Sequence, residues 1–334
     1  MTDTDRELDP ALRELSDWAG DAPPLSPAAR HRMRGRLLAV ADGRSRRLWQ
    51  RPGLRIAASG LVTAALTATV LVVVRDDPGT STARQTVRPV SARTVLAGAA
   101  AYEREHPRAV PTTPPRDDQF VYTKEIIKET DRKTGRTVTH VDENWRSVDG
   151  SQRSWVMEVG KGWWAPPLKK NESVWPPQDW TRLEKLPTDP EKLILSLLHK
   201  TGPNDRNDSL DEITEQEWSE IHFSLAGLLK LVPVMPEGLR PAAFEALGMV
   251  PGVKTVQDQK DAKGRTGVAV TYDDPTLPKG VSGYGGYFIF DPKTYEFLGF
   301  RDGRTSGDGP GMKKYTQLSY LDGWAITDRA KQRP

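Results

Sequence analysis

The feature that most constrains this chain is an uncharged stretch of 19 residues at 56–74, with the sequence IAASGLVTAALTATVLVVV. As a helix it would be about 28 Å long, which matches the roughly 30 Å hydrocarbon thickness of a bilayer. It contains one Gly and no Pro, so nothing in it interrupts a helix. The alternative is a buried helix of a soluble domain, but such a helix is normally shorter or keeps a polar face. The stretch therefore predicts a transmembrane helix, with bounds at 54–75.

Charges beside this stretch predict its orientation. Arg75 is followed at once by two Asp, whereas five arginines precede the stretch, Arg44, Arg46, Arg47, Arg51 and Arg55. The positive-inside rule then places the N-terminus in the cytoplasm and the C-terminal domain outside. A cleaved signal peptide is the competing interpretation, but the apolar run begins about 55 residues into the chain and ends without a small-residue cleavage site. We therefore expect a single-pass protein of the cell membrane.

Net charge differs between the two sides of the stretch. The first 74 residues carry eleven Arg, no Lys and eight acidic residues, whereas the remaining 260 carry 37 basic and 37 acidic residues. Anionic lipid and topology explain the positive excess, and a neutral outer domain gives no reason to expect nucleic-acid binding. The predicted organisation is a cytoplasmic Arg-rich helical segment (1–53), the transmembrane helix (54–75), a linker (76–90) and an extracytoplasmic domain (91–330).

A basic amphipathic helix is predicted within the cytoplasmic segment. It begins at Ser26 and Pro27, which are a favourable N-cap and first helical residue. Two interpretations remain open for it: a solvated juxtamembrane helix, or a helix that docks on a cytoplasmic partner or a lipid surface. The candidate partner-binding residues are Met33 and Leu37 of its apolar stripe and two of the arginines that flank the stripe, Arg30 and Arg34.

Hydrophobic patterning of the outer part predicts an α+β domain. Alternating stretches favour one largely antiparallel sheet, and stretches with helical spacing favour helices packed on one of its faces. The predicted helices are 91–105, 190–200, 212–232 and 241–247. The predicted strands are 119–127, 136–146, 154–159, 253–259, 266–272, 287–291, 296–301 and 314–324.

Motifs for catalysis or metal binding are scarce. The chain has no Cys, which excludes disulfides, thiolate zinc sites, cysteine nucleophiles and a lipoprotein anchor. The five His form neither an HExxH motif nor an H-x-H pair, and no phosphate-binding loop is present. We therefore expect no enzymatic activity, no metal and no cofactor.

Tryptophan is concentrated in one part of the chain. Six of the ten Trp lie within residues 145–180, with four Pro between them. Such rings could line a binding surface for an acyl chain, a lipidated peptide or a glycan, or they could simply fill the core. Alternation within 154–159, together with the charge of Glu158, predicts that Trp155 faces the core and Val156 the solvent. The candidate ligand-binding residues are Trp155, Trp163, Trp164 and Trp175, with Trp163 and Trp164 in a loop.

Three segments resemble a known family. Leu186–Leu198, Ala246–Val270 and Phe288–Gly299 are similar to recurring segments of actinobacterial single-pass membrane proteins, often encoded beside extracytoplasmic-function sigma factors. The resemblance implies a curved, largely antiparallel half-barrel sheet with helices on its concave face, as in lipoprotein carriers and sigma-E regulator B proteins. The chain departs from zinc anti-sigma domains, because His31 has no Cys near it.

Two functions follow as expectations. In the first, the outer domain senses a lipid, a lipoprotein or another envelope ligand and regulates a cytoplasmic partner such as a sigma factor. In the second, the domain is a tethered lipid- or lipoprotein-binding carrier, and the N-terminal segment only orients the anchor.

Overall fold

The computed structural model describes residues 90–169, 174, 176–198, 209–276, 285–306 and 312–334. The predicted cytoplasmic segment, the transmembrane helix and the partner-binding residues Arg30, Met33, Arg34 and Leu37 lie outside the described residues. Among the residues that are described, no helix is both long and apolar enough to cross a membrane.

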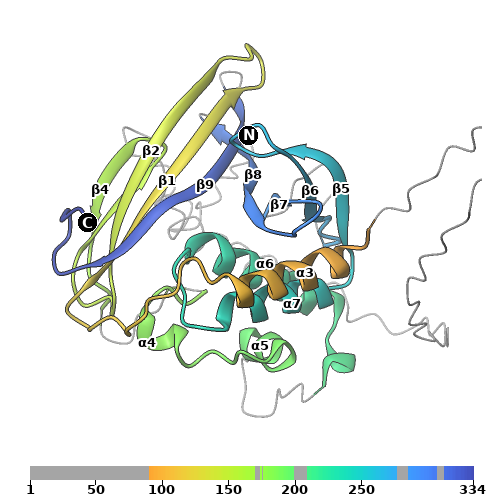
Figure 1. The fold of residues 1–334 in the computed structure, drawn as a ribbon, viewed down its shortest axis with the longest axis horizontal. Helices are drawn as coiled ribbons and strands as arrows, with labels where there is room; N and C mark the ends of the chain where they lie inside the picture. The colour runs from red at the N-terminus through yellow and green to blue at the C-terminus, as the bar shows by residue number, and fades with distance from the viewer. Residues whose placement is uncertain (1–89, 170–173, 175, 199–208, 277–284, 307–311) are drawn as a thin grey trace, which may run out of the picture. The chain divides into compact units, whose positions relative to one another are not determined.

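Nine antiparallel strands form one open sheet in the order β4-β3-β2-β1-β9-β8-β7-β6-β5 (Figure 1). The last strand, β9, lies between β1 and β8 and so joins an N-terminal meander to a C-terminal one. The strands are β1 (Phe120–Asp131), β2 (Thr137–Ser147), β3 (Ser154–Glu158), β4 (Lys161–Ala165), β5 (Val253–Lys260), β6 (Thr266–Tyr272), β7 (Tyr287–Phe290), β8 (Phe297–Ser306) and β9 (Lys313–Thr327).

Side-chain caps fix the starts of most of the helices. The Asp189 carboxylate accepts a hydrogen bond from the backbone N–H of Lys192, and Thr214 and Glu217 form a reciprocal capping box. The helices are α3 (Ala92–Glu105), α4 (Trp180–Leu183), α5 (Pro190–Leu197), α6 (Glu215–Leu231) and α7 (Leu239–Met249), with a short 3-10 helix at Leu210–Glu212.

The main core lies between the helices and the C-terminal half of the sheet, where Figure 1 shows α3, α6 and α7 grouped together. Phe244 of α7 packs edge-on against Phe290 of β7, with ring centroids 5.5 Å apart. Leu96 of α3 and Leu225 of α6 are fully buried in the same cluster. Because one face of β6 and β7 supplies the sheet side of this core, the helices pack on that face.

The predicted α+β class and the antiparallel sheet are confirmed. The sequence predicted eight strands, however, and the structure contains a ninth, β4. The prediction that Trp163 and Trp164 lie in a loop is wrong, because both belong to β4. Lys161 and Gly162 are weak strand formers and hid this strand, which pairing with β3 stabilises.

A two-residue turn connects β3 to β4. Val159 and Gly160 both have positive φ, 51° and 76°, as a type I′ turn requires. Their N–H groups donate to the two carboxylate oxygens of Asp142 on β2, at 2.6 and 2.7 Å. A β-branched residue rarely adopts this backbone conformation, so these hydrogen bonds hold Val159 in a strained state.

Relief of this strain should stabilise the domain. Val159→Asn should raise the free energy of unfolding by about 1 kcal/mol, because Asn tolerates left-handed backbone that a β-branched residue does not. Urea denaturation measures the change. Val159→Ile keeps the branch and should give no gain. A lower stability of the Asn variant would show that packing of the Val159 side chain outweighs its strain.

Candidate functional site

Two of the four predicted ligand-binding tryptophans come together in the structure. Trp155 on β3 lies directly opposite Trp164 on β4, so both project from the same face of the sheet. Their rings meet edge to face, with centroids 5.4 Å apart. Trp163 pairs with Val156 and therefore lies on the other face. Trp175 lies outside the described residues.

These two rings extend a row of aromatic side chains across four strands. The strand register places Tyr122 of β1 opposite Trp145 of β2, and Trp145 opposite Trp155. The rings of Tyr122 and Trp145 are 4.8 Å apart. We call Tyr122, Trp145, Trp155 and Trp164 the aromatic row. Trp145 is buried, whereas Trp164 at the outer end is 39% exposed.

Strand alternation places the aromatic row on the face that points away from α4. Val121, next to Tyr122, packs in a cluster with Trp180 of α4, so the side chain of Tyr122 projects from the opposite face. The prediction that Trp155 faces the core is therefore wrong. Val156 is 6% exposed, whereas Trp155 is only half-buried. The charge of Glu158 misled the assignment, because Glu158 is itself half-buried.

A glycine makes room for the aromatic row. Gly162 follows the turn on β4 and lies on the same face as Trp155. A Cβ atom at this position would lie 2.3 Å from Cζ2 of Trp155, so any larger residue would displace the ring. The sequence offered this signal as the Gly beside the Trp pair, but only the register shows which ring it accommodates.

The last residues of the sequence cover the aromatic row. The Lys331 ammonium lies 3.3 Å from the Trp155 ring centroid and 5.3 Å from the Trp164 centroid. Trp145 Nε1 donates to the Gln332 carbonyl oxygen at 2.6 Å. We call residues 330–333 the basic segment. Sequence reasoning missed it, because a short polar stretch carries no periodicity that would assign it to a sheet face.

An acidic side chain on β2 anchors the basic segment. Glu143 accepts a 2.7 Å hydrogen bond from Arg333 and a 2.8 Å hydrogen bond from the Tyr122 hydroxyl. Burial alone would raise the pKa of Glu143, but the bonds from Arg333 and Tyr122 bring that pKa below its ordinary value. Glu143 is therefore a carboxylate at neutral pH. The pKa of Tyr122 is raised to about 12, mainly by burial and secondly by its hydrogen bond to Glu143.

The opposite face of β1, β8 and β9 is charged. Glu129 accepts hydrogen bonds from Arg304 at 3.1 Å and from Gln317 at 2.8 Å. Lys230 of α6 forms an ion pair with Asp302 of β8. These four ionised side chains are 10–23% exposed. This part of the helix-facing surface therefore suits a polar ligand group better than an acyl chain.

Glu125 lies on the same charged face. Burial is the main cause that raises its pKa from 4.5 to about 7, and the nearby carboxylates of Asp142 and Asp302 add to the shift. A hydrogen bond with Ser319 and the charge of Lys230 act in the opposite direction. Glu125 therefore changes protonation close to neutral pH.

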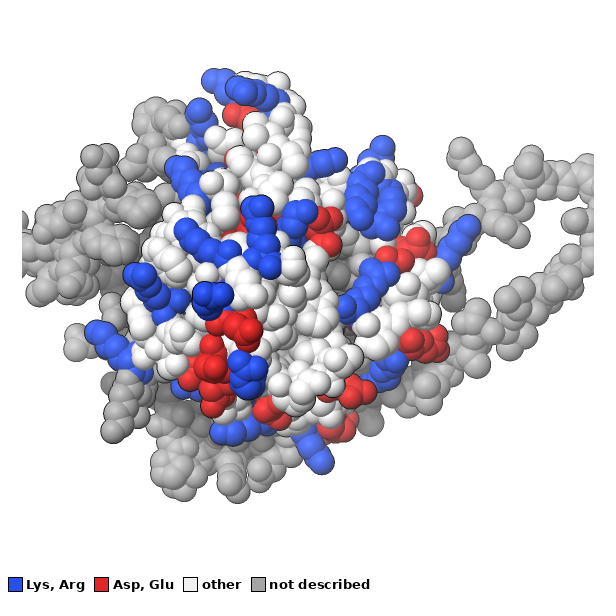
Figure 2. Space-filling model, turned by 60° about the vertical axis from the view of Figure 1, so that its left-hand side comes forward, with Lys and Arg blue, Asp and Glu red and all other residues white. Residues whose placement is uncertain are grey.

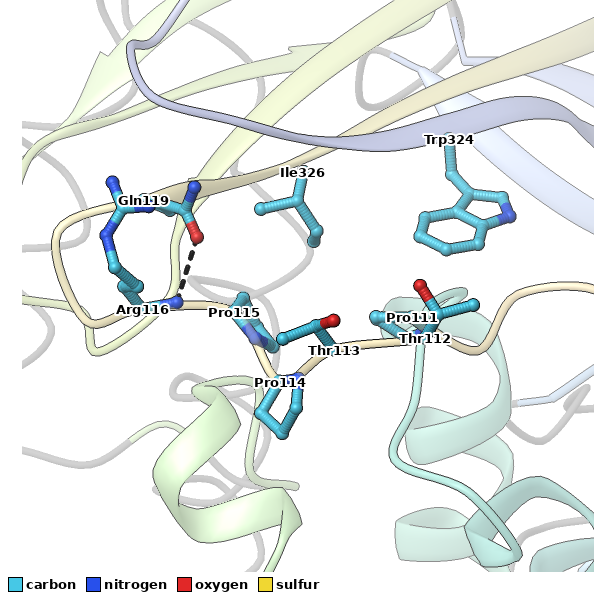
Figure 3. Close-up of a pocket in the computed structure, with 9 residues that line it drawn as sticks. All are labelled: Pro111, Thr112, Thr113, Pro114, Pro115, Arg116, Gln119, Trp324 and Ile326. Atoms are coloured by element: carbon cyan, nitrogen blue, oxygen red, sulfur yellow. Dashed lines mark hydrogen bonds between the residues drawn. The ribbon is translucent and has the colours of Figure 1, made fainter.

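A pocket of about 450 Å³ opens between β9 and the proline-rich segment after α3 (Figure 3). Segment 111–116 forms one wall, and Gln119, Trp324 and Ile326 form the other. Figure 3 shows Trp324 and Ile326 projecting from β9 toward this segment. Trp324 Nε1 donates to the Arg108 carbonyl oxygen at 2.8 Å, which fixes the indole. The walls are mostly apolar, as in small-molecule sites.

Charge on the surface is mixed. Figure 2 shows Lys and Arg side chains spread over one face of the molecule, with Asp and Glu beside several of them. No group of three His, Asp or Glu side chains that could hold a metal ion occurs in the part of the chain that the structure describes.

Comparisons with protein-family models, curated proteins and solved structures find no match to this chain.

Stability should depend on the protonation of Glu125. Its folded-state pKa is raised, so ionisation opposes folding, and stability present at low pH is lost as pH rises. Relative to a Glu125→Gln variant, the unchanged protein should lose on the order of 2 kcal/mol of unfolding free energy between about pH 4.5 and pH 7. Urea denaturation across this window measures the difference.

The matched control for this experiment is Glu105→Gln, which changes an exposed Glu at the end of α3. It should leave the pH dependence of stability as it is. Parallel curves for the unchanged protein and the Glu125→Gln variant would show that Glu125 is well solvated.

Proposed function

We propose that this chain is a single-pass membrane protein whose extracytoplasmic domain binds an envelope or lipid-type ligand and regulates a cytoplasmic partner, as anti-sigma-like proteins do. The observation that carries the proposal is the apolar pocket at Trp324. One of its walls, segment 111–116, begins six residues after the end of α3, and α3 follows the predicted linker and transmembrane helix. A ligand in the pocket would therefore contact a segment that lies close in sequence to the helix next to the predicted membrane anchor.

The fold that we propose for the domain is a curved half-barrel with helices on its concave face, similar to sigma-E regulator B proteins. The open sheet and the packing of the helices on one face support it. The segments that carried the family resemblance coincide with regular structure: Leu186–Leu198 contains α5, Ala246–Val270 runs from α7 into β6, and Phe288–Gly299 spans the turn from β7 to β8.

Contacts at and just after the end of α3 connect the pocket to α7 and to the start of β8. Arg104 donates two hydrogen bonds to Glu245 of α7, at 2.8 and 2.6 Å. Arg108 forms a 2.5 Å ion pair with Glu296 beside β8, and its carbonyl holds Trp324. A shift of segment 111–116 on ligand binding would therefore act on α3 and, through it, on the preceding linker.

A carrier function is the alternative. A tethered lipid- or lipoprotein-binding module would use the same pocket, but its N-terminal segment would not relay a signal. The two proposals differ only in what the cytoplasmic residues do, so they are separable by experiment.

Topology is the first test. Because the chain has no Cys, single cysteines at Ser16 and Ser209 can be labelled without background. An impermeant thiol reagent on intact cells should label the Ser209→Cys variant and leave Ser16→Cys unlabelled, because only residue 209 would lie outside. Permeabilised cells should label both. Labelling of Ser16→Cys on intact cells would refute the proposed orientation.

Deletion of residues 2–42 distinguishes the regulatory function from the carrier function. We expect the deletion to change the host's transcription profile, because it removes the proposed partner-binding helix. The purified deletion variant should still bind a fluorescent fatty acid.

A substitution in the pocket tests the ligand site itself. Ile326→Arg should abolish binding of the fatty acid by placing a charge in the pocket. Val141→Arg, on the opposite face of the sheet, is the control for added charge.

An unchanged transcription profile with intact fatty-acid binding would favour the carrier. Absence of fatty-acid binding in the full chain would remove the lipid ligand from both proposals.

A further inference from the structure

The basic segment covers the aromatic row through contacts made by each of its residues. Ala330 packs against the cluster that contains Trp145, and Lys331 places its ammonium on Trp155 and Trp164. The Gln332 carbonyl accepts a hydrogen bond from Trp145, and Arg333 pairs with Glu143. The row binds an ammonium and a main-chain carbonyl, and Glu143 beside it binds a guanidinium, at three successive residues of the segment.

Aromatic rings, not a carboxylate, hold the ammonium of Lys331. Within the described residues, none of the ion pairs involves Lys331. Its Nζ lies over the Trp155 ring and, at a greater distance, over the Trp164 ring, and the planes of the two indoles are tilted by 72° to each other. Two indoles in this arrangement form a cage for an ammonium group, because the face of each ring carries partial negative charge.

The basic segment is held weakly for its number of contacts. Lys331 has a φ of 65°, a left-handed conformation that costs a residue with a side chain of this kind some stability. The side chain of Arg333 is 73% exposed, and exposed ion pairs contribute little. The aromatic row beneath it is well ordered by strand pairing. The basic segment can therefore be displaced from the aromatic row, whereas the rings of the row stay in place.

We propose that the aromatic row, with Glu143, is a recognition site for a Lys-x-Arg segment of a partner protein, and that residues 330–333 occupy it in cis. The site lies on the face opposite the pocket and does not depend on the proposed lipid ligand. The basic segment would then compete with the partner, with the advantage of the high effective concentration of an attached ligand.

A peptide fits the site better than a choline headgroup does. Both supply a cation for the Trp155–Trp164 cage. A peptide also supplies the carbonyl that Trp145 Nε1 binds and a guanidinium for Glu143. The phosphate of a choline lipid would instead approach the carboxylate of Glu143 and be repelled by it.

The test uses the purified full chain and a fluorescently labelled peptide with the sequence of residues 330–334, AKQRP. Lys331→Ser combined with Arg333→Ser should release the basic segment, and this released variant should bind the peptide at least about tenfold tighter than the unchanged chain. A peptide with Ser in place of Lys and Arg should not bind. Fluorescence anisotropy measures both.

Two neighbouring tryptophans provide the matched pair of variants. In the released variant, Trp164→Ala should weaken peptide binding about tenfold, whereas Trp163→Ala, which changes the ring on the other face of β4, should leave it unaltered. Should Trp164→Ala fail to fold, Glu143→Gln serves instead. It should weaken binding of the unchanged peptide but not of a peptide whose Arg is replaced by Ser.

Three outcomes would overturn the proposal. The first is binding of the peptide to the released variant that is no tighter than binding to the unchanged chain, and the second is an equal loss of binding in Trp163→Ala and Trp164→Ala. Binding of phosphatidylcholine vesicles without binding of the peptide would assign the cage to a lipid headgroup.

Discussion

Backbone pairing of β9 with β1 is the interaction on which the rest of the domain depends. Phe120 at one end of this ladder lies opposite Thr327, about 200 residues later in the chain. On its other side β9 pairs with β8. Without β9 the molecule would be two separate sheets, a four-stranded one that carries Trp145, Trp155, Trp163 and Trp164 and another that packs on the helices. Both the aromatic row and the pocket are next to this strand or part of it.

A bulge in β9 then assigns side chains to the two faces. Lys124 pairs with Gly323 and Glu125 with Leu321, so Asp322 is an extra residue, and it forms a 2.7 Å ion pair with Lys124. Leu321 and Trp324 are three residues apart and would point to opposite faces of a regular strand. Because of the bulge, both pack in the cluster that contains Trp180. The wall of the pocket that Trp324 forms therefore depends on this bulge.

Local patterns predicted much of the fold, and pairing decided most of the site. The helix that starts at Pro190 and the strand at Thr266–Tyr272 were predictable because short-range chemistry specifies them. Trp164 was not, because its strand exists only through pairing with β3. Alternation separated Trp155 from Val156 correctly but could not say which face meets the helices, since that depends on strands and helices distant in sequence. The basic segment could not be predicted either, because its contacts are with strands that lie far from it in the sequence.

The position of the last strand also governs the order of folding. A sheet whose central ladder joins residues this far apart has a high contact order, and such pairings form late. Until residue 327 has been synthesised, β1 and β8 each present a row of unpaired N–H and C=O groups, which is the type of edge that promotes aggregation. β1 can pair with its second neighbour, β9, only after almost the entire domain has been synthesised. The yield of folded protein should therefore depend on how well these two edges are protected from aggregation until β9 has been made.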